Sequence, residues 1–110
     1  MQKPQSLAIL YTTMSMLQDA EKLARLAVQD KYAACVNILP SVQSIYVWEG
    51  TIEQSSECAL IFKTIPERLP ELEAWILDHH PYDVPALLVF DASTSGAFLR
   101  YVTESVKERE

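Results

Sequence analysis

The stretch YAACVNILPSVQSIYVWEGTIEQSSECALIFKT, residues 32–64, decides the fold. It is rich in the β-branched, aromatic and hydroxyl side chains typical of strands, and Glu49-Gly50 is its only turn signal. We therefore predict one long hairpin with arms at 32–48 and 51–64. Each arm is about 14–17 residues long, whereas a typical strand has about 5–6. Pro40-Ser41 in the first arm predicts a bulge or bend.

The outer half of this hairpin, residues 44–54, carries apolar side chains that the rest of the chain has little means to cover. A bare two-stranded apolar ribbon is marginally stable in water and prone to aggregate. Two arrangements are open: a tip folded back on its own domain, and a tip packed on other subunits. We expect the second, an oligomerisation element. The predicted interface residues are Tyr46, Trp48 and Ile52.

The segments before the hairpin predict a strand and then a helix. Residues 6–12 are apolar on both faces, which is typical of a central strand. A helical repeat of alanine and leucine follows and ends near Asp30. Ser15 and Gln18 have the spacing of a capping box at the start of that helix.

The segments after the hairpin predict a helix, a strand and a terminal helix. Proline favours a first helical turn, so the second helix begins between Pro66 and Pro70. It ends before Pro81, because a residue that precedes proline leaves the helical region. We predict the last strand at 85–91 and the terminal helix at 97–107.

The predicted order is therefore β-α-β-β-α-β followed by a helix. This is the α+β, ferredoxin-like βαββαβ arrangement, with an antiparallel four-stranded sheet and both main helices on one face. The length of 110 residues fits a single domain over 1–110. The other face of the sheet is left for the terminal helix or for neighbouring subunits.

The charge of the chain argues against several classes of partner. The formal net charge is −6 and the isoelectric point is about 4.8. Binding to nucleic acid, and to an anionic membrane surface, depends on an excess of Lys and Arg, so we expect neither partner. An acidic surface is compatible with metal cations, and also with simple solubility.

Glycine and cysteine usage narrow the chemistry further. Gly50 and Gly96 are the only glycines, so the phosphate-binding loops built from several glycines are excluded. Cys35 and Cys58 are isolated and are expected to be buried free thiols. No targeting segment is evident in the sequence, and we expect a cytoplasmic protein.

Four segments, taken together, resemble one protein family. They are AACVNILP at 33–40, SIYVWEG at 44–50, the segment 57–64 that ends in Lys-Thr, and HHPYDVP at 79–85. In this order and spacing they are similar to the CutA divalent-cation tolerance proteins, from about residue 7 to about residue 102. The resemblance implies a cytoplasmic homotrimer, similar to PII-type signal proteins, that is linked to tolerance of copper and other divalent cations.

The resemblance also implies a metal site. In the copper-binding members, a cysteine at the end of the first strand joins two adjacent histidines. His79 and His80 match the histidines, whereas Tyr11 occupies the position of the cysteine. A thiolate selects Cu(I), while imidazole suits Cu(II), zinc or nickel. We therefore predict copper or another divalent cation at His79 and His80.

A structural role for the two histidines is the alternative. One would bind the last carbonyl groups of the second helix, and the other would pack against Tyr82 or Trp75. The protein would then be a non-enzymatic trimeric scaffold, or a PII-like signalling module that binds a small ligand or a protein.

We do not expect an enzyme, because no serine or cysteine has a plausible base near it in the sequence. Four further residues are candidates for a cleft between subunits, and sheet packing and a solvated ion pair are the preferred alternative. They are Tyr11, Trp48, Glu57 and Lys63.

Overall fold

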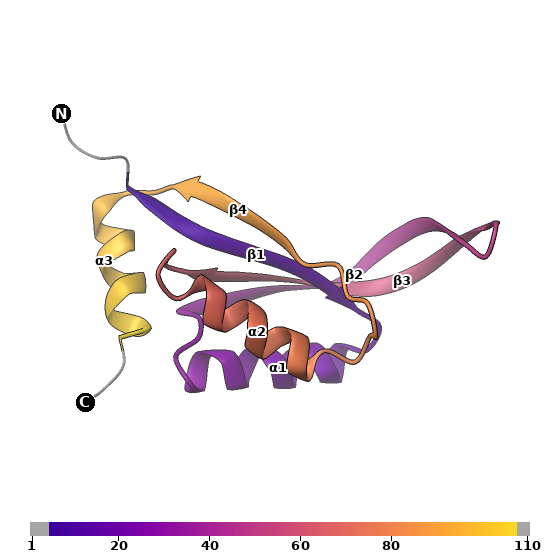
Figure 1. The fold of residues 1–110 in the computed structure, drawn as a ribbon, viewed down its shortest axis with the longest axis horizontal. Coiled ribbons are helices and arrows are strands. Elements are labelled where there is room, and N and C mark those ends of the chain that lie inside the picture. Colours follow the sequence, from indigo (N-terminus) through magenta and orange to yellow (C-terminus); the bar gives the residue numbers. More distant parts are fainter. Residues whose placement is uncertain (1–4, 108–110) are drawn as a thin grey trace.

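The computed structural model describes residues 5–107 and has the predicted order of elements (Figure 1). The strands and helices are β1 (Ser6–Met14), α1 (Leu17–Gln29), β2 (Cys35–Trp48), β3 (Thr51–Thr64), α2 (Leu69–His79), β4 (Leu88–Ser93) and α3 (Gly96–Ser105). The strands form one sheet in the order β2-β3-β1-β4, and all neighbours are antiparallel. The α+β, ferredoxin-like prediction is confirmed. Within the described residues, no helix has the length and apolar character needed to cross a membrane.

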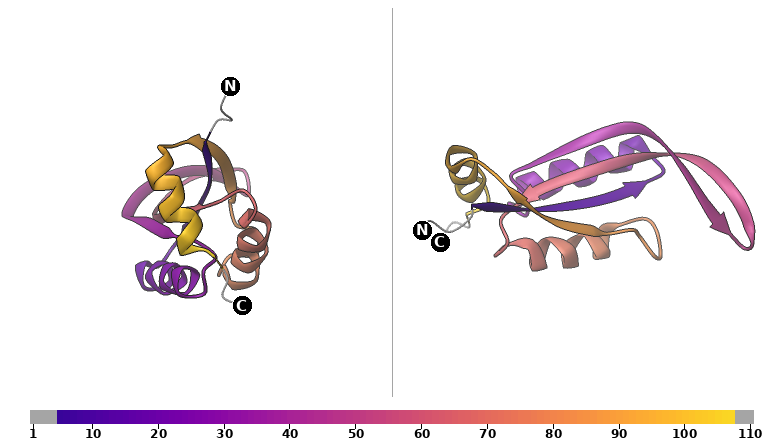
Figure 2. Two further views of the ribbon diagram at one scale, coloured as in Figure 1. Left: turned by 90° about the vertical axis from the view of Figure 1, so that its left-hand side faces the viewer. Right: turned by 90° about the horizontal axis from the view of Figure 1, so that it is seen from above.

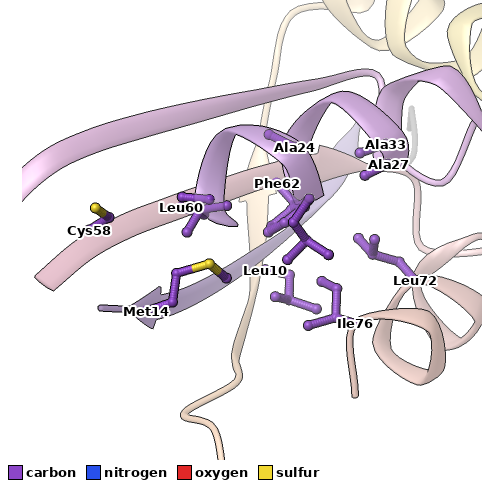
Figure 3. Close-up of a cluster of buried hydrophobic side chains, with 12 residues drawn as sticks. Leu10, Met14, Ala24, Ala27, Ala33, Cys58, Leu60, Phe62, Leu72 and Ile76 are labelled. Atoms are coloured by element: carbon purple, nitrogen blue, oxygen red, sulfur yellow. The ribbon is translucent and has the colours of Figure 1, made fainter. Parts of the chain in front are cut away.

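The main core lies between the sheet and the two helices α1 and α2, which cover the same face (Figures 1 and 2). Leu10 of β1 and Phe62 of β3 are fully buried there against α1 and α2 (Figure 3). Alanines recur along the buried side of α1, which lets its backbone lie close to the strands. Burying one leucine or phenylalanine side chain contributes about 1.5–3 kcal/mol, so this layer holds the fold together.

The helix α3 lies at the end of the sheet that is farthest from the hairpin tip (Figure 1). Val102 and Val106 form a second buried cluster with Leu7 of β1 and Ala34. The hydroxyl of Ser95 accepts a hydrogen bond from the backbone N–H of Phe98 at 3.3 Å and so caps the start of α3. The terminal helix therefore leaves uncovered the centre of the sheet face opposite to α1 and α2.

The β2–β3 hairpin projects well beyond the two helices (Figures 1 and 2). Glu49 and Gly50 both have positive φ, 50° and 80°, which are typical of the type I′ turn that joins twisted strands. The pairing register shifts between Leu39 and Val42, so the predicted bulge at Pro40-Ser41 is confirmed. The alternative of a tip folded back on its own domain is excluded by the exposure of the tip residues.

The two faces of the projecting hairpin differ in chemistry. Register pairs share a face, so Val47 lies beside Ile52, and Ile45 follows one step along. These three side chains, which we call the aliphatic hairpin face, are 68–74% exposed. The opposite face carries Tyr46, Trp48 and their register partners Glu53 and Thr51. Of the three predicted interface residues, Ile52 thus lies on one face, and Tyr46 and Trp48 on the other.

Two local predictions are wrong. The helix α1 begins at Leu17 after Met16, and no side chain caps it, so Ser15 and Gln18 do not form a capping box. The hydroxyl of Ser15 instead bonds to Tyr82, 67 residues further along the chain. The last strand begins at Leu88 rather than at residue 85, because its pairing with β1 starts at Tyr11 and Leu88.

Candidate functional site

Polar side chains converge where β1 ends, the hairpin leaves the sheet, and the loop between α2 and β4 crosses. Thr13 and Ser15 come from the end of β1, Glu57 from β3, and His80 and Tyr82 from the loop. Pro81 ends α2 and turns the chain toward β1, which brings the loop against the sheet. These five residues form one hydrogen-bonded network.

His80 is the buried centre of this network and is only 8% exposed. Its Nδ1 accepts a hydrogen bond from the backbone N–H of Tyr82 at 3.0 Å. Nδ1 is therefore unprotonated, and Nε2–H donates to the carbonyl oxygen of Thr13 at 2.9 Å, with the hydroxyl of Thr12 at 3.1 Å. Burial lowers the pKa of His80, and the Thr13 carbonyl and the charge of Glu57 only partly offset that effect. The ring is thus held neutral, with both nitrogens engaged.

Glu57 is held as a carboxylate by hydroxyl groups. The phenol of Tyr82 donates to Glu57 Oε2 at 2.7 Å, and the hydroxyl of Ser15 lies 3.0 Å from the same phenol oxygen. Partial burial by itself would raise the pKa of Glu57, but hydrogen bonds from Ser44, Tyr82 and Thr13 outweigh it, so the pKa is lowered. Burial also raises the pKa of Tyr82, which stays a phenol and keeps donating.

His79 has surroundings unlike those of His80. Its ring stacks on Trp75 with the ring centroids 4.6 Å apart, and its Nδ1 lies 2.8 Å from the carbonyl oxygen of Trp75. A carbonyl only accepts, so Nδ1 carries a proton, and Nε2 is the nitrogen of this exposed ring that is left to bind a metal ion. The contacts of both rings match the structural alternative, since the His80 ring also packs on Tyr82 at 4.9 Å.

The three residues of the implied metal site are not brought together. Successive side chains of a strand point to opposite faces, so Tyr11 projects from the face opposite to Thr12, whose hydroxyl approaches His80. His80 has no free ring nitrogen in this arrangement, and His79 offers one. Within residues 5–107, no group of three or more His, Cys, Asp or Glu side chains lies close enough to hold a metal ion. Metal binding at the histidine pair stays a prediction.

Both cysteines are free thiols, as predicted; Cys58 is buried, whereas Cys35 is only half-buried, so the predicted burial is wrong for Cys35. The four residues predicted near a cleft lie in different parts of the fold. Cys35 pairs with Lys63 in the β2–β3 register and both cysteines are free. The ammonium group of Lys63 lies over the ring of Phe98, near the α3 end of the sheet. Tyr11 lies at the centre of β1, whereas Trp48 and Glu57 both line a groove beside the network.

This groove, of about 850 Å³, runs along the Tyr46 and Trp48 face of the hairpin. The loop between α2 and β4 forms its second wall, with Tyr82, and Thr13 and Ser15 lie at its end. Sequence reasoning missed the roles of Ser15 and Tyr82. The signal available for Tyr82 was its position directly after Pro81, where a helix must end and a side chain is free to meet the sheet.

A second uncovered apolar surface lies on the sheet face opposite to α1 and α2. Ile9 pairs with Phe90, and Tyr11 with Leu88, so these four side chains share that face. Leu88 and Phe90 are each half exposed. We call these four residues the outer sheet face. A folded monomer rarely leaves two such surfaces bare, and their usual partner is another protein surface.

Comparison with known proteins gives one consistent result. The family model described as CutA1 divalent ion tolerance protein matches residues 8–105. The chain is 36% identical over 100 residues to the chloroplastic Protein CutA of Arabidopsis thaliana, covering 90% of this chain and 55% of that protein. It is 33% identical over 109 residues to Protein CutA of Homo sapiens, covering 96% of this chain and 61% of that protein. The chain thus spans 55–61% of the length of these curated relatives.

Solved structures agree over nearly the whole fold. CutA from Synechococcus elongatus PCC7942 has a TM-score of 0.91 and 36% identity, covering 96% of this chain and 95% of that one. The divalent ion tolerance protein CutA1 from Ehrlichia chaffeensis has a TM-score of 0.90 and 32% identity, covering 93% of this chain and 96% of that one. The resemblance seen in the four sequence segments is confirmed.

Proposed function

This chain belongs to the CutA1 divalent ion tolerance family, and from that premise we propose that it is a non-enzymatic divalent-cation tolerance protein that acts as a homotrimer in the cytoplasm. The single observation that supports the homotrimer is the presence of two uncovered apolar surfaces on one chain. The aliphatic hairpin face stands clear of its own domain, and the outer sheet face lies bare beside β4. Among residues 5–107, no element covers the aliphatic hairpin face, and α3 reaches the outer sheet face only at Ile9.

The two surfaces differ, and this favours a ring. A contact between two different surfaces of identical subunits is heterologous, and it closes into a ring when the rotation allows. The hairpin of one subunit would lie on the outer sheet face of the next, and each subunit would both give and receive a hairpin. Covering Ile45, Val47 and Ile52 would contribute several kcal/mol per contact, at about 1.5–3 kcal/mol for a fully buried side chain.

The lack of catalysis is supported by how the network uses its polar groups. A serine nucleophile needs an imidazole base within hydrogen-bond reach. Ser15 bonds to Tyr82 instead, and both nitrogens of His80 are engaged with backbone groups. The two free cysteines and the net charge of −6 support a reducing compartment and argue against a nucleic-acid or membrane partner.

The trimer is tested by one charge placed on the aliphatic hairpin face. We expect the protein to sediment as a trimer at low micromolar concentration, and Ile52→Glu to shift it toward the monomer. The matched control is Leu77→Glu, which places the same charge on an exposed apolar side chain of α2, away from the hairpin. A wild-type protein that sediments as a monomer, or an Ile52→Glu variant that stays fully trimeric, would refute the proposal.

Metal binding by His79 and His80 is the second candidate function. The exposed Nε2 of His79 favours it, because an unprotonated imidazole nitrogen is a good ligand for Cu(II) and zinc. Engaging His80 as well requires its ring to release either Tyr82 N–H or the Thr13 carbonyl. A site in the trimer would take its remaining ligands from a neighbouring subunit.

Calorimetric titration with Cu(II), Zn(II) and Cu(I) tests this second candidate. If the pair binds metal, His79→Ala should weaken binding at least tenfold, and the double alanine variant should abolish it while the trimer remains. Binding that is indifferent to both variants would refute the histidine site. The protein would then be the metal-free alternative, a trimeric scaffold or PII-like signalling module.

A further inference from the structure

The groove beside the hairpin has the chemistry of a binding site for an organic cation. Two carboxylates, Glu53 and Glu57, line it together with three aromatic side chains, Tyr46, Trp48 and Tyr82. None of the described residues that line it is a lysine, arginine or histidine. The groove thus carries two negative charges with no positive side chain in its lining.

The charge at Glu57 is fixed in place. Its carboxylate accepts hydrogen bonds from hydroxyl groups, including that of Tyr82 at 2.7 Å, and hydroxyl groups orient a carboxylate without neutralising it. The neighbouring His80 adds no positive charge, because both of its nitrogens bond to backbone groups as a neutral ring. The network therefore presents a positioned anion at one end of the groove.

The aromatic rings select the kind of cation. Tyr46 is 44% exposed and Trp48 is 63% exposed, so their ring faces are open to the groove. Ring faces attract ammonium groups, and more strongly when the cation has shed its water. Magnesium and calcium instead require a shell of about six to eight oxygen ligands, which ring faces do not provide. The lining therefore favours an alkylammonium group over a hydrated divalent metal.

The spacing of the carboxylates selects the length of the ligand. Glu53 and Glu57 are four residues apart in β3 and share a face, so their Cα atoms are about 13 Å apart at a rise of about 3.4 Å per residue. Tyr46 lies opposite Glu53, and its hydroxyl reaches Ser55, midway between the two glutamates in β3, at 3.4 Å. Two ammonium groups joined by an extended aliphatic chain would meet both carboxylates and lay the chain across the tyrosine.

We propose that this groove binds a linear polyamine, with one terminal ammonium group at Glu57, the other at Glu53, and the aliphatic chain against Tyr46 and Trp48. Neither histidine lines the groove, and His80 contributes only through its hydrogen bond to Tyr82. The groove is on the opposite face of the hairpin from Ile45, Val47 and Ile52. Tyr46 and Trp48, which the sequence predicted as interface residues, would therefore line the groove, and the hairpin contact of the proposed trimer would depend on the aliphatic hairpin face.

The experiment is calorimetric titration of the full chain with spermidine, putrescine and magnesium chloride at one ionic strength. Spermidine reaches both carboxylates and the shorter putrescine does not, so we expect spermidine to bind at least tenfold more tightly than either competitor. Glu53→Gln and Glu57→Gln should each weaken spermidine binding tenfold or more. Trp48→Leu, which keeps both charges, should weaken it several-fold.

The matched control is Glu49→Gln, which removes the same charge from the exposed hairpin turn outside the groove. We expect it to change spermidine affinity by less than twofold. An equal loss in Glu49→Gln would mean that the polyamine only senses net charge, and the proposal would be overturned. So would undetectable spermidine binding, or putrescine binding as tightly as spermidine. Glu53 is exposed and Glu53→Gln should fold normally, so the test does not depend on the buried network.

Discussion

Replacing His80 with alanine should destabilise the protein far more than replacing its neighbour His79. The two residues are adjacent in sequence and identical in type, yet one is buried among backbone partners and the other is exposed on a helix. The pair is therefore its own matched control. The comparison separates the structural contribution of His80 from any role that both rings share in binding metal.

The magnitude follows from the groups that His80→Ala leaves behind. The carbonyl of Thr13 and the N–H of Tyr82 both lose their partner, and an unpaired buried polar group costs about 1–3 kcal/mol. His80 is 8% exposed, so water can reach part of the vacated site, which favours the lower part of that range. We expect a total loss of about 2–4 kcal/mol, which is large against the typical stability of about 5–15 kcal/mol. His79→Ala removes one hydrogen bond and an exposed ring stack, so we expect a loss of about 0.5–1 kcal/mol.

Urea unfolding followed by circular dichroism measures both variants. The subunit concentration must be the same in every sample, because self-association adds to the apparent stability. The midpoint and the slope together give the free energy of unfolding. An unchanged slope shows that the variant exposes the same amount of surface on unfolding as the wild type. Chelator is present throughout, so that no bound metal contributes. If His80→Ala loses no more stability than His79→Ala, the assignment of His80 as a buried hydrogen-bonded centre is wrong.

Three further predictions address the network, the turn and the core. The pKa of His80 is lowered from 6.5 and that of Glu57 from 4.5, so the unfolded chain binds these protons first as the pH falls. The free energy of unfolding, measured from urea midpoints, should therefore decrease below pH 6.5 and again below pH 4.5. His80→Gln should remove only the first of these two decreases, and a first decrease that persists in this variant would contradict the assignment to His80. Gly50→Ala meets open space but must hold a φ of 80°, so a loss of about 1 kcal/mol is expected in the same assay, and no loss would contradict the positive-φ turn. Phe62→Ala empties a fully buried position and should cost about 3–5 kcal/mol, whereas a cost below about 1 kcal/mol would show that the core lies elsewhere.

Local sequence signals were sufficient for most of the fold. The hairpin, its bulge at Pro40-Ser41 and the start of α2 near Pro70 each depend on turn or proline chemistry that acts within a few residues. The apolar side chains on both faces of β1 indicate a central strand, because both faces of such a strand are covered. The order of these elements then left the ferredoxin-like sheet as the arrangement to expect.

The candidate site was less predictable because its contacts are long-range. Ser15 and Tyr82 are 67 residues apart, and so a capping box was the only use that neighbouring residues suggested for Ser15. Nothing local distinguishes His79 from His80, although one is exposed and the other is buried. Their difference arises where the loop after α2 meets the end of β1, which only the folded chain specifies.

The position of β1 has a consequence for how the chain is made. It leaves the ribosome before the other strands of its sheet, yet its two neighbours in that sheet are β3 and β4. About 80 residues separate Met14 from Ser93, so at about 5–20 residues per second β1 waits roughly 4–16 s before its last partner has been synthesised. The β2–β3 hairpin is local and can form within microseconds of its own emergence. The nascent chain can therefore pair β1 with the finished hairpin through β3 while the other edge of β1 stays open until β4 emerges. An open apolar strand edge is prone to wrong pairing, so this interval is when binding by a chaperone would matter most.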